Sequence, residues 1–290
     1  MNKILTAAAL TAAIGLSSCG GSRTNPFFEA YDTPYEIPPF DKIEYSDYLP
    51  AVEKGIADQK AEIDAIVKQR STPDFENTIL AMEKSGELLN KVMLVFASLD
   101  ETDNNEQMQE LSEKIYPMVS EASDEIAMNP LLFEKVKYVY ENRDSMGLDT
   151  AQKRAVEETY KSFARSGALL SDADKEQLKA VNKRLTDLYL TFNKNLLAAT
   201  NEFELVVDNE EDLAGIPAGI VATAAEEAKA RGKEGKWVFT LHAPSRLPVL
   251  KYADNRDVRK KMYEGYMNLA SQAPYDNRPV INDIVHARAE

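Results

Sequence analysis

Apolar side chains recur with the 3.6-residue period of an α-helix along most of this chain. Such a stripe predicts an amphipathic helix that buries one face against a neighbour. The stripes cover residues 50–67, 75–99, 108–118, 130–147, 150–167 and 171–200. No fixed repeat length relates them, which removes the main support for a helical-repeat solenoid. The sequence therefore predicts a mainly α fold in which helices pack on helices.

The residues that flank these stripes predict where individual helices begin. Pro50 is expected in the first turn of the first helix, where a missing N–H has little effect. Thr72 is expected as the N-cap of the second helix, which should run to Leu99 and pair antiparallel with the first. Ser171, followed three residues later by Asp174, resembles a capping box that opens a long helix.

The helical pattern is interrupted in the last third of the chain. Leu205 and Val207 continue an apolar alternation that starts at Phe203, and residues 237–241 form a second β-prone run. Between these runs, residues 217–231 have the pattern of a helix. The sequence therefore predicts one short β-ribbon inside the helical protein.

Residues 1–18 resemble a lipoprotein signal peptide. Lys3 supplies a positive charge, and residues 4–16 form an apolar stretch too short to span a bilayer stably. The sequence Leu16-Ser17-Ser18-Cys19 resembles the lipobox, in which the cysteine becomes the lipidated first residue. Cys19 is the only cysteine, so the chain cannot form an internal disulfide. We therefore expect lipidation at Cys19 and a lipid-anchored protein in the cell envelope, on the periplasmic side, rather than an incidental cysteine in a cleaved leader.

The chain after this leader divides into three stretches. Residues 19–40 are a tether followed by an extended segment rich in proline and aromatic residues. Residues 41–200 form the region of paired helices, and residues 201–290 contain the strand-helix-strand insert and further helices. The last stripe, at residues 280–285, is followed by no capping residue, so we expect a longer polypeptide.

The charge balance argues against one class of partner. The chain has 48 Asp and Glu against 34 Lys and Arg, a net charge of −14, which is unlike a protein that binds nucleic acid. The acidic clusters at residues 100–103, 172–174 and 208–212 lack the spacing of an EF-hand loop and predict solvated carboxylates. The densest basic run, residues 256–261, predicts the exposed face of a helix.

Histidine is scarce: His242 and His286 are the only two. A catalytic zinc site commonly uses three protein ligands, and a serine or cysteine hydrolase needs a base, usually histidine. Neither histidine belongs to a His-Glu-x-x-His pair, and the chain has no Gly-x-Ser-x-Gly motif or Gly-rich phosphate loop. Glycoside hydrolysis by a pair of carboxylates stays open as a hypothesis, because the sequence does not give the distance between two such groups in space. The residues by themselves predict no catalytic residue and no metal ligand in this chain.

A series of short motifs resembles the N-terminal half of the thimet-oligopeptidase-like zinc peptidases, the family of bacterial peptidyl-dipeptidase Dcp and oligopeptidase A. The motifs extend from Asn25 towards Glu290 and so cover almost all of the chain after the leader. They include Asn25-Pro26-Phe27, Pro38-Pro39-Phe40-Asp41-Lys42-Ile43, Tyr48-Leu49-Pro50-Ala51, Phe75-Glu76-Asn77-Thr78-Ile79, Glu83-Lys84-Ser85-Gly86, Asp212-Leu213-Ala214-Gly215-Ile216-Pro217, Trp237-Val238-Phe239-Thr240-Leu241, Pro244-Ser245, Tyr252-Ala253-Asp254-Asn255-Arg256 and Asp276-Asn277-Arg278-Pro279-Val280-Ile281.

The resemblance implies a multi-helix N-terminal lobe that forms one wall of a deep channel between two lobes. In that family a His-Glu-x-x-His helix and a later Glu hold zinc, all in the C-terminal half, so zinc is expected in the intact protein with its ligands outside this chain. It also implies short peptides as substrates, the missing C-terminal catalytic domain as a partner, and inactivity of these residues alone. The alternative is a non-enzymatic helical lipoprotein that binds peptides or a protein partner.

Overall fold

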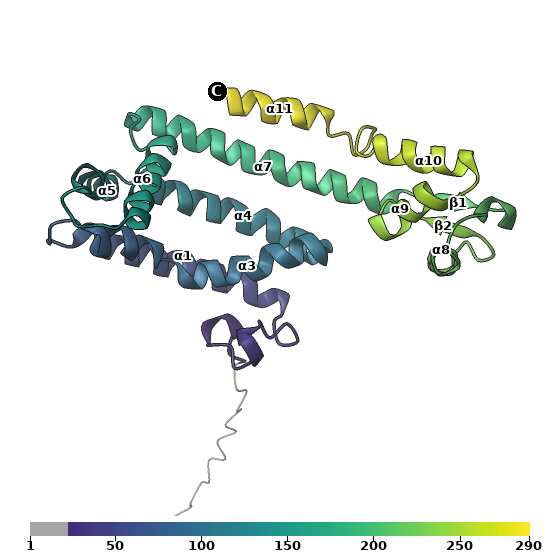
Figure 1. Ribbon diagram of the computed structural model, residues 1–290, viewed down its shortest axis with the longest axis horizontal. Coiled ribbons are helices and arrows are strands. Elements are labelled where there is room, and N and C mark those ends of the chain that lie inside the picture. The colour runs from purple at the N-terminus through teal and green to yellow at the C-terminus, as the bar shows by residue number, and fades with distance from the viewer. Residues whose placement is uncertain (1–22) are drawn as a thin grey trace, which may run out of the picture.

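The computed structural model describes residues 23–290 and confirms a mainly α fold with one short β-ribbon (Figure 1). The predicted signal peptide and the lipidation site at Cys19 lie outside the described residues. The helices are α1 (Tyr45–Lys68), α2 (Ala81–Glu83), α3 (Glu87–Thr102), α4 (Glu106–Ala127), α5 (Pro130–Asn142), α6 (Thr150–Arg165), α7 (Asp172–Glu202), α8 (Ala218–Ala230), α9 (Ala243–Tyr252), α10 (Arg256–Met267) and α11 (Arg278–Ala289). Shorter elements are the 3₁₀ turns η1 (Pro26–Phe28), η2 (Pro34–Glu36) and η4 (Glu210–Leu213), the π-helical turn η3 (Phe75–Leu80), and the strands β1 (Leu205–Val207) and β2 (Trp237–Phe239).

Helices α1 and α3 form the predicted antiparallel hairpin. The rings of Tyr48 and Phe96 lie 5.3 Å apart between centroids, while farther along α1 the Glu62 carboxylate accepts a 2.7 Å hydrogen bond from the Gly86 N–H. The two helices therefore run in opposite directions. Between these contacts Gly55 faces the backbone of Leu89, and a Cβ at Gly55 would lie only 2.8 Å from it. The absence of a side chain lets the two helices approach closely.

The predicted start of the second helix is wrong by two residues. Asp74, not Thr72, is the N-cap: its carboxylate accepts from the Asn77 N–H at 2.8 Å, and the Asn77 side chain accepts from the Asp74 N–H at 3.0 Å. Thr72 instead offers its backbone carbonyl to the Asn77 amide. The carboxylate takes the capping role because, three residues ahead of Asn77, it completes a reciprocal pair.

The expected continuous helix to Leu99 is also interrupted. Gly86 has a φ of +74°, a left-handed conformation that ends the first segment and lets α3 begin at Glu87. Pro50 differs too, because α1 begins at Tyr45 and so places this proline in its second turn. The start of α7 is as predicted, with the Ser171 hydroxyl accepting from the Asp174 N–H. The capping box is not completed, because the Asp174 carboxylate accepts from the Ser171 hydroxyl and not from its N–H.

Helix α7 is the longest helix of the described residues and lies at the centre of the fold. Its 31 residues correspond to a length of about 46 Å. Helix α4 packs along one side of it and α11 along the other (Figure 1). The Asn182 side chain donates to Asp124 on α4 at 2.8 Å, and the Asn195 side chain donates to Asn277, at the N-terminus of α11, at 3.0 Å.

The far end of α7 leads into a small unit built around the predicted ribbon. Strands β1 and β2 are antiparallel, with Leu205 opposite Phe239. Phe239, Val249 and Met262 are fully buried there and join the strands to α8, α9 and α10 in one apolar cluster. The N-terminal end of α7 follows α5 and α6. These two helices pack through stacked tyrosine rings, with 4.1 Å between the centroids of Tyr140 on α5 and Tyr160 on α6.

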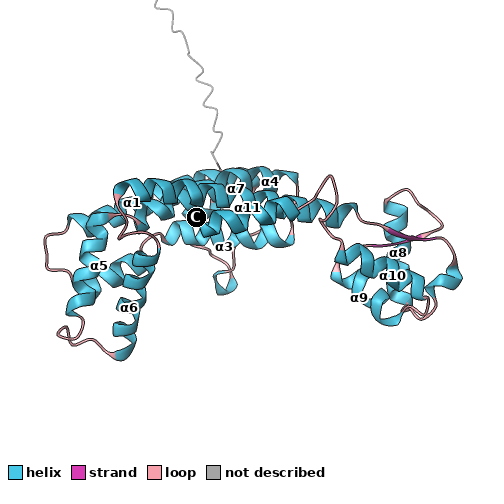
Figure 2. Cartoon of the chain, turned by 90° about the horizontal axis from the view of Figure 1, so that it is seen from above, coloured by secondary structure: helices cyan, strands magenta, loops and turns pink. Residues whose placement is uncertain are grey.

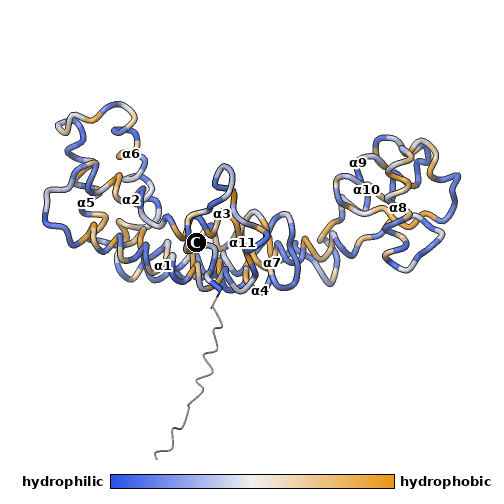
Figure 3. The backbone as a smooth tube through the Cα atoms, turned by 90° about the horizontal axis from the view of Figure 1, so that it is seen from below, coloured by the Kyte–Doolittle hydropathy of each residue, from blue (hydrophilic) through white to orange (hydrophobic). Residues whose placement is uncertain are grey.

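These two ends give the molecule the outline of a trough. In Figure 2, α5 and α6 project from one end of the long helical layer, and the α8–α10 unit projects from the other end on the same side. Figure 3 shows the same two arms from the opposite viewpoint, with α1, α4, α7 and α11 as the floor between them. The fold therefore has one concave side bounded by two arms.

Candidate functional site

Helix α7 leaves much of its predicted apolar stripe accessible. Lys175 is its only buried residue, although the helix is the longest of the described chain. The stripe side chains are half-buried rather than enclosed; they are Leu178, Leu185, Leu188, Phe192 and Leu196. An amphipathic helix usually buries its stripe against a neighbour, so the floor of the trough has an incompletely covered surface.

A groove of about 1090 Å³ runs between α4 and α7 and reaches the end of α3. It mixes apolar and polar side chains, which is typical of ligand sites that combine burial with orientation. Its representative lining residues are Asp100, Tyr116, Ser120, Thr186, Tyr189 and Leu197. The groove is therefore the candidate binding site of this chain.

A hydrogen-bonded carboxylate organises one end of this groove. Asp100 accepts from the Ser112 hydroxyl at 2.8 Å, from the Tyr116 hydroxyl at 3.0 Å and from the Asn104 amide at 2.6 Å. Burial, and then the Asp100 charge, raises the pKa of Tyr116 well above its ordinary value, so this phenol stays protonated and donates. Asp100 is half-buried, and two of its donors come from α4, 12 and 16 residues later, which the local sequence did not predict.

A second carboxylate lies farther along the groove. Burial raises the pKa of Asp124, while the hydrogen bond from Asn182 and the charge of Lys179 act in the opposite direction. The acids that line the groove outnumber its one lysine, Lys194, which is paired with Glu113 at 2.8 Å. The groove consequently offers hydrogen-bond acceptors and favours positive groups, such as a ligand amine.

The two histidines are placed apart and outside this groove. His242 is exposed at the N-cap of α9, with no side-chain capping bond, and His286 is exposed on α11. Within residues 23–290, no three His, Cys, Asp or Glu side chains are grouped so that they could hold a metal ion. The hydrogen-bonding groups and apolar side chains that line the groove suit the binding and orientation of a ligand.

The basic run at residues 256–261 lies on α10, as predicted for an exposed helix face. Arg259 is the half-buried member, and its guanidinium donates to the backbone carbonyls of Ala253 and Asp254. Tyr263, on the next turn, is 55% exposed. Arg259 therefore stabilises the local backbone, while the other basic residues of the run are exposed.

Comparison with known proteins finds relatives over nearly the whole chain. It is 37% identical over 267 residues to the dipeptidyl carboxypeptidase of Escherichia coli, covering 92% of this chain and 39% of that protein. It is 34% identical over 266 residues to the dipeptidyl carboxypeptidase of Salmonella typhimurium, covering 91% of this chain and 39% of that protein. It is 31% identical over 272 residues to oligopeptidase A of Escherichia coli, again covering 92% and 39%. No family model matches the chain.

Proposed function

We propose, because this chain is homologous to the N-terminal part of the thimet-oligopeptidase family of metallopeptidases, that it forms one wall of the peptide channel in a larger peptidase. The chain spans about 39% of the length of these relatives. The peptidase activity of the whole protein is therefore itself part of the proposal. One observation carries it: the similarity to dipeptidyl carboxypeptidase continues across 92% of the chain. The substrates would be short peptides, and the reaction would be peptide hydrolysis of the peptidyl-dipeptidase or oligopeptidase type.

The geometry of the trough supports this role. A channel wall needs an accessible concave face, and the two arms bound such a face (Figures 2 and 3). The groove lies between α4 and α7, which are two of the helices of its floor. Asp100 and Asp124 would orient a peptide through its N–H groups, while Leu197 and Tyr189 would contact its side chains. A narrow channel would also admit unfolded peptides and exclude folded proteins.

The zinc ion that such a peptidase uses does not fit the described residues. His242 and His286 lie on different elements, and the described part of the chain has no grouping of potential ligands. We therefore place the zinc ligands outside these residues, in the C-terminal catalytic domain. The contribution of this chain is to bind and orient the peptide.

The outer face of α11 supports a further part of the protein as a partner. Ala287 is buried on the side of α7, yet Ile281 is 46% and Val285 60% exposed on the same helix. A helix with apolar residues on more than one face is commonly covered on each of them. We propose that the catalytic domain packs over Ile281 and Val285.

Export and lipid anchoring at Cys19 complete the proposal. The support is the sequence of the leader and lipobox. Among residues 23–290, no helix combines the length and apolar character needed to cross a membrane. The acylated cysteine would hold the protein in the cell envelope.

Narrowing the groove tests the wall directly. Thr191 is an exposed α7 residue that lines the groove, so Thr191→Trp should fill it with little effect on folding. In the product of a reading frame that continues beyond Glu290, we expect this variant to raise KM for short peptides by roughly threefold or more with kcat little changed, since uniform binding is lost. The matched control is Lys183→Trp, exposed on α7 but outside the groove lining. Equal KM values in both variants would contradict the proposal that the substrate binds in the groove.

The alternative is a non-enzymatic lipoprotein that binds peptides, and the location of the groove within this chain favours it. The coding sequence after the Glu290 codon separates the two. An open frame that encodes His-Glu-x-x-His on a helix supports the peptidase. A stop codon with no such frame, together with peptide binding by the chain itself, supports the binding protein.

A further inference from the structure

We propose that a loop of proline and aromatic residues beside the lipid tether docks on a zwitterionic membrane surface. The loop consists of residues 28–40 and is called the aromatic loop below. The proposal rests on the proposed lipidation of Cys19, and it adds a second contact with the membrane and an orientation of the trough relative to it.

The aromatic loop exposes an unusual share of large apolar side chains. Tyr35 is 96% exposed, Ile37 and Phe40 are each 51% exposed, and Phe28 is 42% exposed. Single exposed apolar residues are normal on a protein surface, but several in one short loop indicate a contact site. Rings of Tyr and Phe suit the interface between water and lipid, where one end of the side chain is wet and the other apolar.

The loop is held in this outward arrangement by contacts with the body. Phe27, immediately before it, is buried, and its ring centroid lies 5.4 Å from that of Tyr48 on α1. The Lys91 ammonium on α3 donates to the carbonyl of Phe27 at 3.1 Å and to that of Glu29 at 2.6 Å. The base of the loop is therefore fixed to the α1–α3 hairpin.

The tip of the loop has a backbone that non-glycine residues rarely adopt. Tyr35 has a φ of +59° and Glu36 a φ of +56°. Such left-handed residues persist only where the surrounding structure determines them, and they gather at functional sites. Tyr35, in this left-handed stretch, is also the most exposed large apolar residue of the loop.

The position of the tether places this loop near the bilayer. The Arg23 guanidinium donates two 2.8 Å hydrogen bonds to the Asp47 carboxylate, so the described chain begins firmly on α1. Cys19 is only four residues earlier, a distance of at most about 14 Å for an extended chain. In Figure 1 this beginning of the chain and the aromatic loop lie together beneath α1 and α3, at the edge opposite α7 and α11. A lipid on Cys19 would bring that edge to the headgroups.

Charge selects the kind of membrane surface. The exposed acids Glu29, Asp32, Glu36 and Asp41 surround the apolar side chains, so anionic lipids would repel the loop. The rings must then supply the attraction, which is weak for so few residues and becomes effective only with a second signal such as an acyl chain. A zwitterionic surface next to the tether satisfies both conditions.

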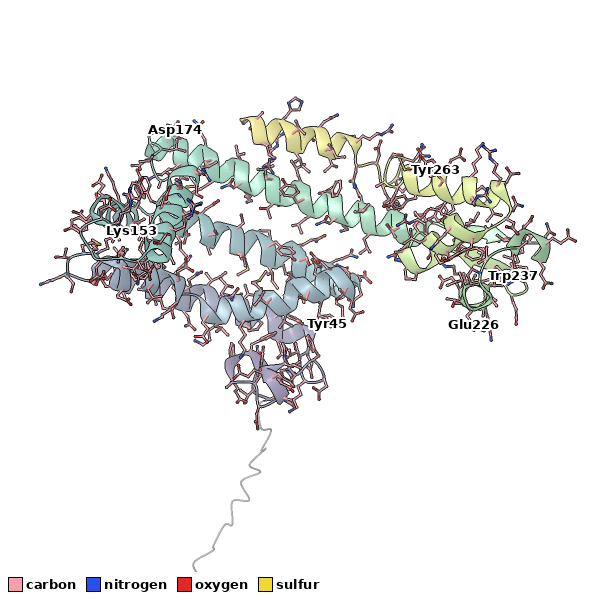
Figure 4. All side chains as sticks on the ribbon, in the orientation of Figure 1. Tyr45, Lys153, Asp174, Glu226, Trp237 and Tyr263 are labelled. Carbon is pink, nitrogen blue, oxygen red and sulfur yellow. The ribbon has the colours of Figure 1, made fainter. Side chains whose placement is uncertain are left out.

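A single-tryptophan reporter tests the docking. Cys19 and Trp237 are the only cysteine and tryptophan, so the chain from Cys19 onward can be coupled to a maleimide lipid at one site, and Tyr35→Trp with Trp237→Phe gives one fluorophore. In zwitterionic vesicles with brominated acyl chains, we expect the emission of this variant to fall about twofold relative to unbrominated vesicles, because the ring sits at the interface. The control, Tyr263→Trp with Trp237→Phe, reports from α10 at the far end of the molecule (Figure 4) and should show no change.

Several results would overturn the proposal. One is unchanged emission from the Tyr35→Trp reporter on brominated vesicles; another is equal quenching of the Tyr263→Trp control. Phe40→Trp in the same background repeats the measurement away from the left-handed backbone and guards against a local folding defect. The same reporter can be placed in the product of a reading frame that continues beyond Glu290. If the tryptophan at residue 35 is shielded from water there without vesicles, another part of the protein covers the loop, and the proposal fails. Chemical coupling keeps this test independent of lipidation in the cell, which mass spectrometry of Cys19 examines separately.

Discussion

Two glycines show how much a single side chain matters to this fold. At Gly55 the α1–α3 hairpin leaves no room, since an added Cβ would lie 2.8 Å from the backbone of Leu89. At Gly219, near the start of α8, an added Cβ would meet nothing within 4 Å. The same chemical change therefore has opposite expected effects at the two positions.

Gly55→Ala should lower the free energy of unfolding by about 1–3 kcal/mol, because the helices must separate to admit the methyl group. Gly219→Ala, the matched control, should be neutral or stabilising by up to about 1 kcal/mol, because alanine favours the helix. Urea unfolding of both variants measures the difference. Equal stability of the two variants would contradict the close packing at Gly55.

Asp124 predicts a dependence of stability on pH. Burial raises its pKa in the folded state above the ordinary value of 3.8, so the folded protein holds this proton more tightly than the unfolded chain. The stabilisation is present below the unfolded pKa and is lost as the pH rises through the folded pKa. Asp124→Asn, which is never charged, should therefore gain stability relative to the natural protein as the pH rises above 3.8 and through the folded-state pKa of Asp124. Urea unfolding at several pH values measures the gap, and a gap that narrows as the pH rises would be contrary to this account.

At the scale of elements, Asn277 joins the last helix to the central one. It is 3% exposed, accepts from Asn195 at 3.0 Å and donates to the Phe192 carbonyl at 2.9 Å. Asn277 was part of a motif in the sequence, yet its partners lie 82 and 85 residues earlier. The amide therefore sets how α11 lies on α7.

Asn277→Ala should cost about 1–3 kcal/mol, because it leaves the Phe192 carbonyl and the Asn195 amide without their partner. Asn268→Ala is the control, since Asn268 is exposed and donates only to the Glu264 carbonyl of its own helix. Hydrogen exchange of α11 should quicken in the first variant alone. Unchanged protection of α11 after the loss of Asn277 would argue that other contacts hold this helix.

The sequence predicted elements whose causes are local and missed those whose causes are distant. The Ser171 cap of α7 depends on a residue three positions away, and each strand of the β-ribbon shows in its own short run of residues; both are confirmed, although the pairing of the strands joins distant residues. The break at Gly86 involves Glu62, 24 residues earlier, and the acceptor role of Asp100 depends on donors of another helix. Periodicity reports which face of a helix is apolar, and it does not report what that face meets.

At the scale of the whole molecule, the trough arises from one long helix with an arm at each end. Its floor leaves α7 half-covered and carries the groove, while the aromatic loop lies at the opposite edge from α11 (Figure 1). This arrangement could not be read from the sequence, because it depends on how α4, α7 and α11 pack over large separations. Under the function proposed above, the half-covered floor would be a surface that faces the catalytic domain.

An assay for hydrolysis of an oligopeptide into dipeptides or other short peptides, with zinc present, tests the central proposal most directly. Residues 19–290 alone should release none, and the product of a frame that continues past Glu290 should release them until a chelator removes the metal. Robust, chelator-sensitive hydrolysis by residues 19–290 alone would contradict the proposal that the zinc ligands lie elsewhere.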